Sequence, residues 1–141
     1  MSRLHGVETS REAMVQMCDT LDLPHEALTR PARTYSKGMS QKLGLAGCFL
    51  SRKPLLILDE PMTGLDPKAR ALLKRHLTTL RGGTGTVFFS THMLFDVEAL
   101  CDRMGVLHEG QLRFVGTPEA CCEAYGATNL EEAYLRCIGA D

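Results

Sequence analysis

Apolar positions follow two different spacings along the chain, and the change comes near residue 54. Before it, apolar side chains recur every three or four residues, which predicts a helix over residues 9–22. Thr9 and Glu12 form a Thr-x-x-Glu capping box at its start, and Pro24 follows its end. The apolar face of this helix consists of Met14, Met17, Cys18 and Leu21.

A second helix is predicted from about Ser36 to Leu50, after a polar loop over residues 24–35 that contains two prolines. Pro54 closes this segment, so the first third of the chain is expected to be helical. The expected inward face of the second helix consists of Met39, Leu43, Ala46 and Leu50.

After Pro54 the chain alternates short apolar runs with helical patterns. The runs 55–58 and 87–89 are continuous, as in strands buried on both faces, and a helix is predicted between them over residues 67–81. Strands that alternate with helices predict an α/β fold with a mostly parallel sheet and crossover helices. The expected inward face of the helix between the runs is Ala69, Leu72, Leu73, His76 and Leu80.

The last part of the chain predicts a short helix over about residues 93–101 and a hairpin over about residues 104–115. Two further helices follow. Thr117 marks the start of the first, and a capping box of Thr128 and Glu131 marks the start of the second. The apolar face of the final helix consists of Leu130, Tyr134, Cys137 and Ile138.

Composition narrows the class of protein. The chain has 141 residues, of which 44% are hydrophobic and 23% charged, and its formal net charge is −1. This size and composition suit one globular domain, and the small net charge excludes an overall basic field for nucleic acid or an anionic membrane. No apolar run approaches the roughly 20 residues of a membrane span, and no signal-peptide pattern opens the chain. We therefore expect a soluble, non-secreted protein.

The cysteines show no CxxC pair and no histidine at the spacing of a zinc finger. Several of them lie on apolar stripes of predicted helices. We expect free thiols in a reducing compartment, with a metal site as the weaker alternative. The cysteines are Cys18, Cys48, Cys101, Cys121, Cys122 and Cys137.

Ionisable side chains follow both apolar runs. Asp59 and Glu60 follow the first run, and His92 follows the second, at the edge where α/β sheets bind ligands. Adjacent carboxylates need a partner there: Mg²⁺ shared with a nucleotide phosphate suits the aspartate, and the glutamate would accept a proton from water. Alternatively, Asp59 begins a turn, Glu60 is solvated and His92 makes a structural hydrogen bond.

Four motifs, in an unbroken order, resemble those of the ATP-binding-cassette (ABC) ATPases over about residues 1–120. Tyr35–Lys42 resembles the signature loop, and Leu55–Glu60 resembles the Walker-B strand. Gly64–Pro67 resembles the D-loop, and His92 stands in the place of the switch histidine. The resemblance implies a partial P-loop NTPase fold that takes ATP and Mg²⁺.

In the family, the signature loop reaches across a dimer to the terminal phosphate of a nucleotide on the other subunit. The helix N-terminus that opens at Ser36 is suited to anions, although Ser36 is equally well read as an N-cap. Lys37 and Met39 stand where the family usually has glycine and glutamine. Lys37 would add a positive charge near the phosphate, although a solvated lysine is an equal alternative. The nucleotide-binding residues that the resemblance implies are Ser36, Lys37, Gly38, Met39 and Gln41.

The resemblance also assigns roles at the strand ends. It implies that Asp59 holds Mg²⁺, that Glu60 polarises the hydrolytic water and that His92 binds the terminal phosphate. Asp66 would bridge the two subunits, although an aspartate before Pro67 is also an ordinary helix N-cap. Both interpretations of Asp66 stay open.

The sequence contains no Gly-x-x-x-x-Gly-Lys-Ser/Thr phosphate loop, because no lysine follows a glycine, and the glutamine loop and adenine-stacking aromatic residue are also missing. We expect residues 1–53 to be a helical subdomain with the signature loop. Residues 54–116 would be part of the ATPase core, and residues 117–141 C-terminal helices. A missing N-terminal half would leave apolar strand surface uncovered, so the chain is expected to be marginally stable alone.

Together these features predict the C-terminal part of an ATP-hydrolysing subunit of an ABC transporter, with export favoured. The expected partners are transmembrane permease subunits, a second ATPase subunit in a head-to-tail dimer and the missing N-terminal half, at the cytoplasmic face of the plasma membrane. No nucleic-acid partner is expected, and the chain alone is expected to be inactive. The alternatives are a non-catalytic regulatory or dimerisation module, a truncated reading frame without function, and a relative that works on ribosomes or DNA repair.

Overall fold

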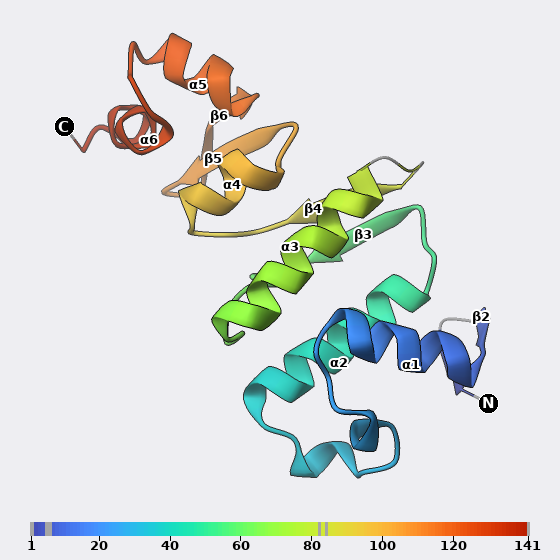
Figure 1. Ribbon diagram of the computed structural model, residues 1–141. Coiled ribbons are helices and arrows are strands. Elements are labelled where there is room, and N and C mark those ends of the chain that lie inside the picture. Colours follow the sequence, from blue (N-terminus) through green and yellow to red (C-terminus); the bar gives the residue numbers. More distant parts are fainter. Residues whose placement is uncertain (1, 5–6, 82, 84, 141) are drawn as a thin grey trace. The chain divides into compact units, whose positions relative to one another are not determined.

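The chain forms two compact units in the computed structural model, and each has its own hydrophobic core. The first unit is Met1–Ser90 and the second is Thr91–Asp141 (Figure 1). The described residues are 2–4, 7–81, 83 and 85–140.

The first unit opens with a short hairpin that the apolar pattern does not predict. Strand β1 (Ser2–Leu4) pairs antiparallel with β2 (Val7–Thr9), and helix α1 (Arg11–Thr20) follows. The predicted polar loop contains two short 3₁₀ turns, η1 (His25–Leu28) and η2 (Ala32–Thr34). The helical character of this region is therefore confirmed, with a loop that is more ordered than expected.

Helix α1 begins at a different cap from the predicted one. The Ser10 hydroxyl accepts a hydrogen bond from the Ala13 N–H at 3.1 Å, so Ser10 is the N-cap. The predicted box of Thr9 and Glu12 is wrong by one residue, because Thr9 is the last residue of β2 and its side chain is buried. Both residue types cap helices well, so the sequence alone does not separate them.

Tyr35 fastens the loop after α1 to the helices. Its hydroxyl donates a hydrogen bond to the carbonyl oxygen of Ala27, and its ring packs against a small core cluster. A partly buried hydroxyl benefits from such a partner, and this bond holds the loop before α2 (Lys37–Leu50). The buried members of the cluster are Cys18, Leu23 and Ala27, and its partly buried members include Leu28, Met39 and Leu43.

Helix α2 starts where the sequence predicts, but it turns a different face inward. Of the predicted inward face, only Ala46 is buried, since the helix packs on two sides rather than along one stripe. Met39 lies against the cluster on α1, whereas Phe49 contacts the ring of His76 at a centroid distance of 4.5 Å. The buried residues of α2 are Lys42, Leu45, Ala46 and Phe49.

The α/β part of the first unit is a β-α-β crossover, as predicted. Strands β3 (Leu55–Leu58) and β4 (Thr86–Phe89) pair in parallel, with Leu58 opposite Phe89, and helix α3 (Pro67–Arg81) connects them. Figure 1 shows α3 running alongside the strand pair. The buried residues of α3 are Ala69, Leu73 and Leu77, whereas Leu72, His76 and Leu80 of the predicted face are half-buried.

The strand pair is buried on one face rather than on both, so that expectation is wrong for the described chain. Leu55, Ile57 and Phe88 share the open face and are 52%, 70% and 65% exposed. Ile57 lies directly opposite Phe88 in the register, so these side chains form one continuous apolar surface. A continuous apolar surface of this kind is unusual on the outside of a soluble protein. It favours a further strand or helix that covers this face.

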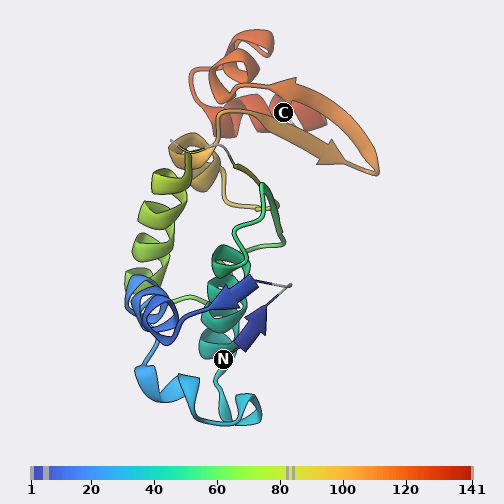
Figure 2. The same ribbon diagram turned by 90° about the vertical axis from the view of Figure 1, so that its right-hand side faces the viewer.

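The second unit contains the predicted antiparallel hairpin and the predicted helices, which pack on it. Figure 2 shows the long hairpin of β5 and β6 with α5 and α6 beside it. Its core cluster consists of Val97, Cys121, Leu130 and Ala133. Its elements are α4 (Leu94–Leu100), β5 (Met104–His108), β6 (Gln111–Gly116), α5 (Pro118–Ala124) and α6 (Leu130–Ile138).

The caps of the last two helices differ in how well they were predicted. Thr117 caps α5 as expected, accepting from the Ala120 N–H at 3.1 Å. Helix α6 is capped by Asn129, which accepts from the Glu132 N–H at 2.9 Å, so the predicted box that starts at Thr128 is wrong by one residue. The Glu132 carboxylate in turn accepts from the N–H and the hydroxyl of Thr128, the residue before the cap.

All six cysteines are free thiols. Among the helices of the described residues, none combines the length and hydropathy that a bilayer crossing requires. Within the same residues, no three histidine, cysteine, aspartate or glutamate side chains converge as a metal-holding group.

Truncating Leu73 to alanine should lower the free energy of unfolding by about 3 kcal/mol, because the Leu73 side chain is fully buried and its loss leaves a cavity. Ile57→Ala removes aliphatic atoms from a largely exposed position, and should cost less than about 1 kcal/mol. Urea unfolding of the two variants measures both values. Equal losses would contradict the described burial of the two faces.

Candidate functional site

Ser90 joins the ends of the two parallel strands. It follows β4, and its hydroxyl donates to the Asp59 carboxylate at 2.5 Å while accepting from the Glu60 N–H at 2.9 Å. Parallel pairing brings both strand ends to one edge, so the first residue after β4 lies beside the first residues after β3. One hydroxyl therefore fixes both the carboxylate of Asp59 and the backbone of Glu60.

Glu60 begins a tight turn in an uncommon backbone conformation. Its φ is 45°, in the left-handed region that few residues with side chains adopt. Two contacts from Thr63 hold the turn: its N–H donates to the Glu60 carbonyl at 3.0 Å, and its hydroxyl donates to the Glu60 carboxylate at 3.1 Å. Together with the Ser90 bond, these contacts hold the Glu60 side chain at the sheet edge.

The N-terminus of α2 lies against the turn that leads to α3. A Cβ on Gly38 would lie 3.2 Å from the Gly64 carbonyl oxygen, so the two backbones approach closely. Gly64 has a φ of 78°, a conformation that favours glycine. Gln41 adds a bond from its side-chain amide to the Pro61 carbonyl at 3.3 Å. The structure thus brings the Lys37–Gln41 segment and the Asp59–Asp66 turn together.

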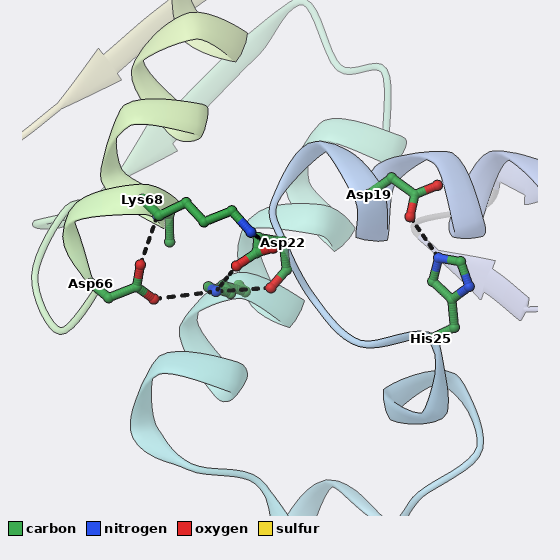
Figure 3. A network of polar contacts seen from close by, with 7 residues as sticks. Asp19, Asp22, His25, Asp66 and Lys68 are labelled. Carbon is green, nitrogen blue, oxygen red and sulfur yellow. Dashed lines mark hydrogen bonds and ion pairs between the residues drawn. The ribbon is translucent and has the colours of Figure 1, made fainter.

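Asp66 caps helix α3 and also belongs to an ion-pair network. Its carboxylate accepts from the Ala69 N–H at 2.9 Å and lies 3.6 Å from the Lys42 ammonium (Figure 3). The hydrogen bond from the Ala69 backbone is the main reason that the pKa of Asp66 lies below its usual range, and the Lys42 charge adds to it. The predicted N-cap role is thereby observed, and bridging between subunits stays a prediction.

His92 lies in the second unit, in the segment before α4, and its side chain is exposed. The neighbouring Thr91 hydroxyl accepts from the Met93 N–H at 3.1 Å, which shapes the entry into α4. The role of His92 at the terminal phosphate, which the family resemblance implies, stays a prediction, since His92 and Asp59 belong to different units.

The residue pattern fits a divalent cation shared with a phosphate. Mg²⁺ takes one or two protein oxygens and completes its shell with water and phosphate oxygens. The exposed Asp59 carboxylate, with the Ser90 hydroxyl beside it, supplies oxygen ligands of this kind. A single aspartate is sufficient in such a site, which needs no larger protein cage.

Sequence reasoning missed Ser90, Thr63 and Lys42, although each contacts a predicted site residue. Ser90 could have been predicted, because ligands bind at the carboxyl ends of parallel strands. That rule applies to the residue after the second strand as much as to Asp59 after the first. Thr63 and Lys42 depend on side-chain packing that no spacing reveals.

Comparisons with known proteins show the class of the chain. Residues 20–95, more than half of the chain, match the model of a P-loop NTPase family described as "AAA domain, putative AbiEii toxin, Type IV TA system". A solved structure titled "Structure of ATP binding subunit of ABC transporter" is similar with a TM-score of 0.80 and 29% identity, over 91% of this chain and 55% of that chain. The class of the protein is therefore the P-loop NTPases.

Three curated relatives define the family more narrowly than the class does. The Nod factor export ATP-binding protein I of Rhizobium leguminosarum bv. viciae is 44% identical over 72% of this chain and 32% of its own length. The Bacillus subtilis linearmycin resistance ATP-binding protein LnrL is 30% identical over 95% of this chain and 45% of its own length. YdbJ of Bacillus subtilis, an uncharacterized ABC transporter ATP-binding protein, is 44% identical over 62% and 29%.

The chain belongs to the ABC ATPase family, and the predicted partial P-loop NTPase fold is confirmed. It spans less than half the length of these curated relatives.

Replacing Ser90 with alanine should lower the free energy of unfolding by about 1 kcal/mol, because two hydrogen bonds at the sheet edge are lost. The Glu60 amide should then exchange with solvent faster. Ser90→Thr keeps the hydroxyl and serves as the control. Denaturant unfolding and amide exchange measure the two effects. A Glu60 amide that exchanges equally slowly in Ser90→Ala would contradict the assigned bond.

His76 should make the stability of the chain depend on pH. Burial against Phe49 lowers the pKa of His76 below its usual value of 6.5, and its buried Nε2 atom finds no hydrogen-bond partner among the described residues. Below about pH 6.5 the unfolded chain therefore binds the proton more readily, and stability falls as the pH drops through this window.

Urea unfolding between about pH 7.5 and about pH 5.5 measures this dependence. His76→Phe keeps an aromatic ring beside Phe49 and should flatten the profile. His25→Gln changes an exposed histidine and should leave the His76 contribution in place. A profile that is as steep in His76→Phe as in the unmodified chain would contradict the assignment.

Proposed function

We propose that the chain is the later part of an ATP-hydrolysing subunit of an ABC transporter that works in export. The observation that carries the proposal is the Ser90 hydroxyl bonded to both Asp59 and Glu60, beside the close approach of Gly38 to Gly64. The names of two relatives, Nod factor export and linearmycin resistance, favour export over import.

Glu60 is the proposed general base. Its carboxylate is oriented by the Thr63 hydroxyl, and its place after a strand suits a group that accepts a proton from attacking water. Asp59 would hold Mg²⁺ together with ATP phosphate oxygens. When bound, this cation would offset negative charge that develops on the transferring phosphoryl group. His92 is proposed to donate a hydrogen bond to the terminal phosphate.

The signature segment is proposed to receive the nucleotide held by a second subunit. Ser36 and Lys37 are exposed at the start of α2, no acidic side chain occupies its first turn, and the helix N-terminus carries partial positive charge. The Met39 N–H donates to the Ser36 hydroxyl at 3.2 Å, so Ser36 is the N-cap of α2. A phosphate would compete for this N–H, and the Ser36 hydroxyl and the Gly38 backbone are the other proposed phosphate-side groups. Gln41 instead donates to the Pro61 carbonyl, so its proposed role is to hold the segment against the Asp59–Asp66 turn.

The proposed partners are transmembrane permease subunits, a second ATPase subunit reached through Asp66 and the signature segment, and an N-terminal half that carries the phosphate loop. The open apolar face of Leu55, Ile57 and Phe88 supports the last of these, because a neighbouring strand and helix would bury it. The assembly would act at the cytoplasmic face of the plasma membrane. The chain alone is proposed to be inactive.

The test uses the chain completed by an N-terminal half with a phosphate loop. Glu60→Gln should reduce Mg²⁺-dependent ATP hydrolysis by at least about 100-fold while ATP binding persists, because the amide cannot accept the proton. Phosphate release and nucleotide binding measure the two effects. Glu26→Gln, at an exposed glutamate of the η1 turn, is the control.

Two outcomes would contradict the proposal. Full hydrolysis by Glu60→Gln would remove the assigned base. A well-folded completed chain that binds ATP without hydrolysing it would favour a non-catalytic module instead.

A further inference from the structure

Lys42 is a buried lysine that lies between two carboxylates from different parts of the first unit. Only 10% of its side chain is exposed. Its ammonium donates to the Asp22 carbonyl at 2.9 Å and lies 3.7 Å from the Asp22 carboxylate and 3.6 Å from the Asp66 carboxylate (Figure 3). The ion pairs link the turn after α1 to the turn before α3.

The two ion pairs compete for one charge. An ammonium taken out of water needs compensating partners, and here two carboxylates at nearly equal distance share it. Asp22 has a second cation, since Lys68 lies 2.5 Å from its other oxygen. Asp66 has a second donor, the Ala69 N–H. Each carboxylate is therefore held in place on one side and is free to gain or lose Lys42 on the other.

The backbone at Asp22 makes its position specific. Asp22 has a φ of 53°, so the chain reverses sharply there directly after α1, and this turn presents both the carbonyl and the carboxylate to Lys42. A shift of α1 or of this turn would change the Lys42–Asp22 distance first. Because Lys42 is on α2 and cannot follow both partners, the Lys42–Asp66 pair would tighten or loosen in response.

We propose that Lys42 is a positioning residue that couples the turn after α1, through Asp22, to the orientation of Asp66 before α3. This inference rests on the proposed function for its use: Asp66 follows the proposed base Glu60 by six positions in the same turn, and α1 packs against α2, which opens with the proposed signature segment. Through this shared lysine, movement of α1 reaches the turn that carries the catalytic glutamate.

The coupling is tested in the full chain by NMR titration of the Asp66 carboxylate. Lys42→Met should raise the pKa of Asp66, since the cation is lost. Asp22→Asn should lower it, since Lys42 is no longer divided between two carboxylates. Lys42→Arg keeps the charge and should leave the pKa of Asp66 close to that of the unmodified chain, so a folding failure of Lys42→Met does not end the test.

The double variant separates coupling from direct repulsion between the carboxylates. If Lys42 carries the coupling, Asp22→Asn should shift Asp66 less in the Lys42→Met background than alone. Lys68→Met removes an exposed lysine from the same Asp22 and should shift Asp66 less than Lys42→Met does. An equal shift in both backgrounds, or none with Asp22→Asn, would overturn the proposal. If Lys42→Met does not fold, an unchanged Asp66 in Asp22→Asn overturns it.

The activity arm uses the chain completed with a phosphate loop. Asp22→Asn should lower kcat about tenfold with KM for ATP nearly unchanged, since binding groups are untouched and only the turn is reset. A completed chain without any hydrolysis refutes the proposed function, and the titration then decides the coupling by itself. If Asp22→Asn leaves kcat unchanged, the proposed effect of the coupling on hydrolysis is overturned.

Discussion

The parallel pairing of β3 with β4 is the constraint on which the first unit depends. Because the two strands run in the same direction, the chain after each of them leaves at one edge, and Ser90 meets Asp59 and Glu60 there. The connection between the strands crosses over through α3, which begins at Pro67, soon after Glu60. The tight turn at Glu60 and the cap at Asp66 are consequences of that short distance.

The positions of elements were predictable, because local spacing and turn residues decide them. Both parallel strands, α2, α3 and the final hairpin follow from apolar runs and from punctuation by proline and glycine.

Buried faces were less predictable. Helix α2 packs on two sides. Among the described residues Ile57 stays exposed, although its apolar run predicts burial. The predicted N-cap was wrong by one residue where two adjacent residues can both cap a helix. The observed caps there are Ser10 and Asn129.

The candidate site divides in the same way. Asp59 and Glu60 were recognisable because two carboxylates directly after an apolar strand are unusual, and family motifs around them were in order. The side chains that orient them, Ser90 and Thr63, carry no such signal, since serine and threonine are ordinary turn residues. Lys42 would have been expected on the solvent side of α2, and only the packed structure shows it to be buried.

The left-handed backbone conformation of Glu60 costs stability, whereas the proposed catalytic role requires its side chain. A residue with a side chain pays roughly 1 kcal/mol to hold a φ of 45°, and glycine does not. Glycine at this position would thus relax the turn and remove the carboxylate in one step. Selection of variants for heat resistance alone would therefore favour Glu60→Gly, which removes the proposed base. Thermostability and function need to be selected together at this position.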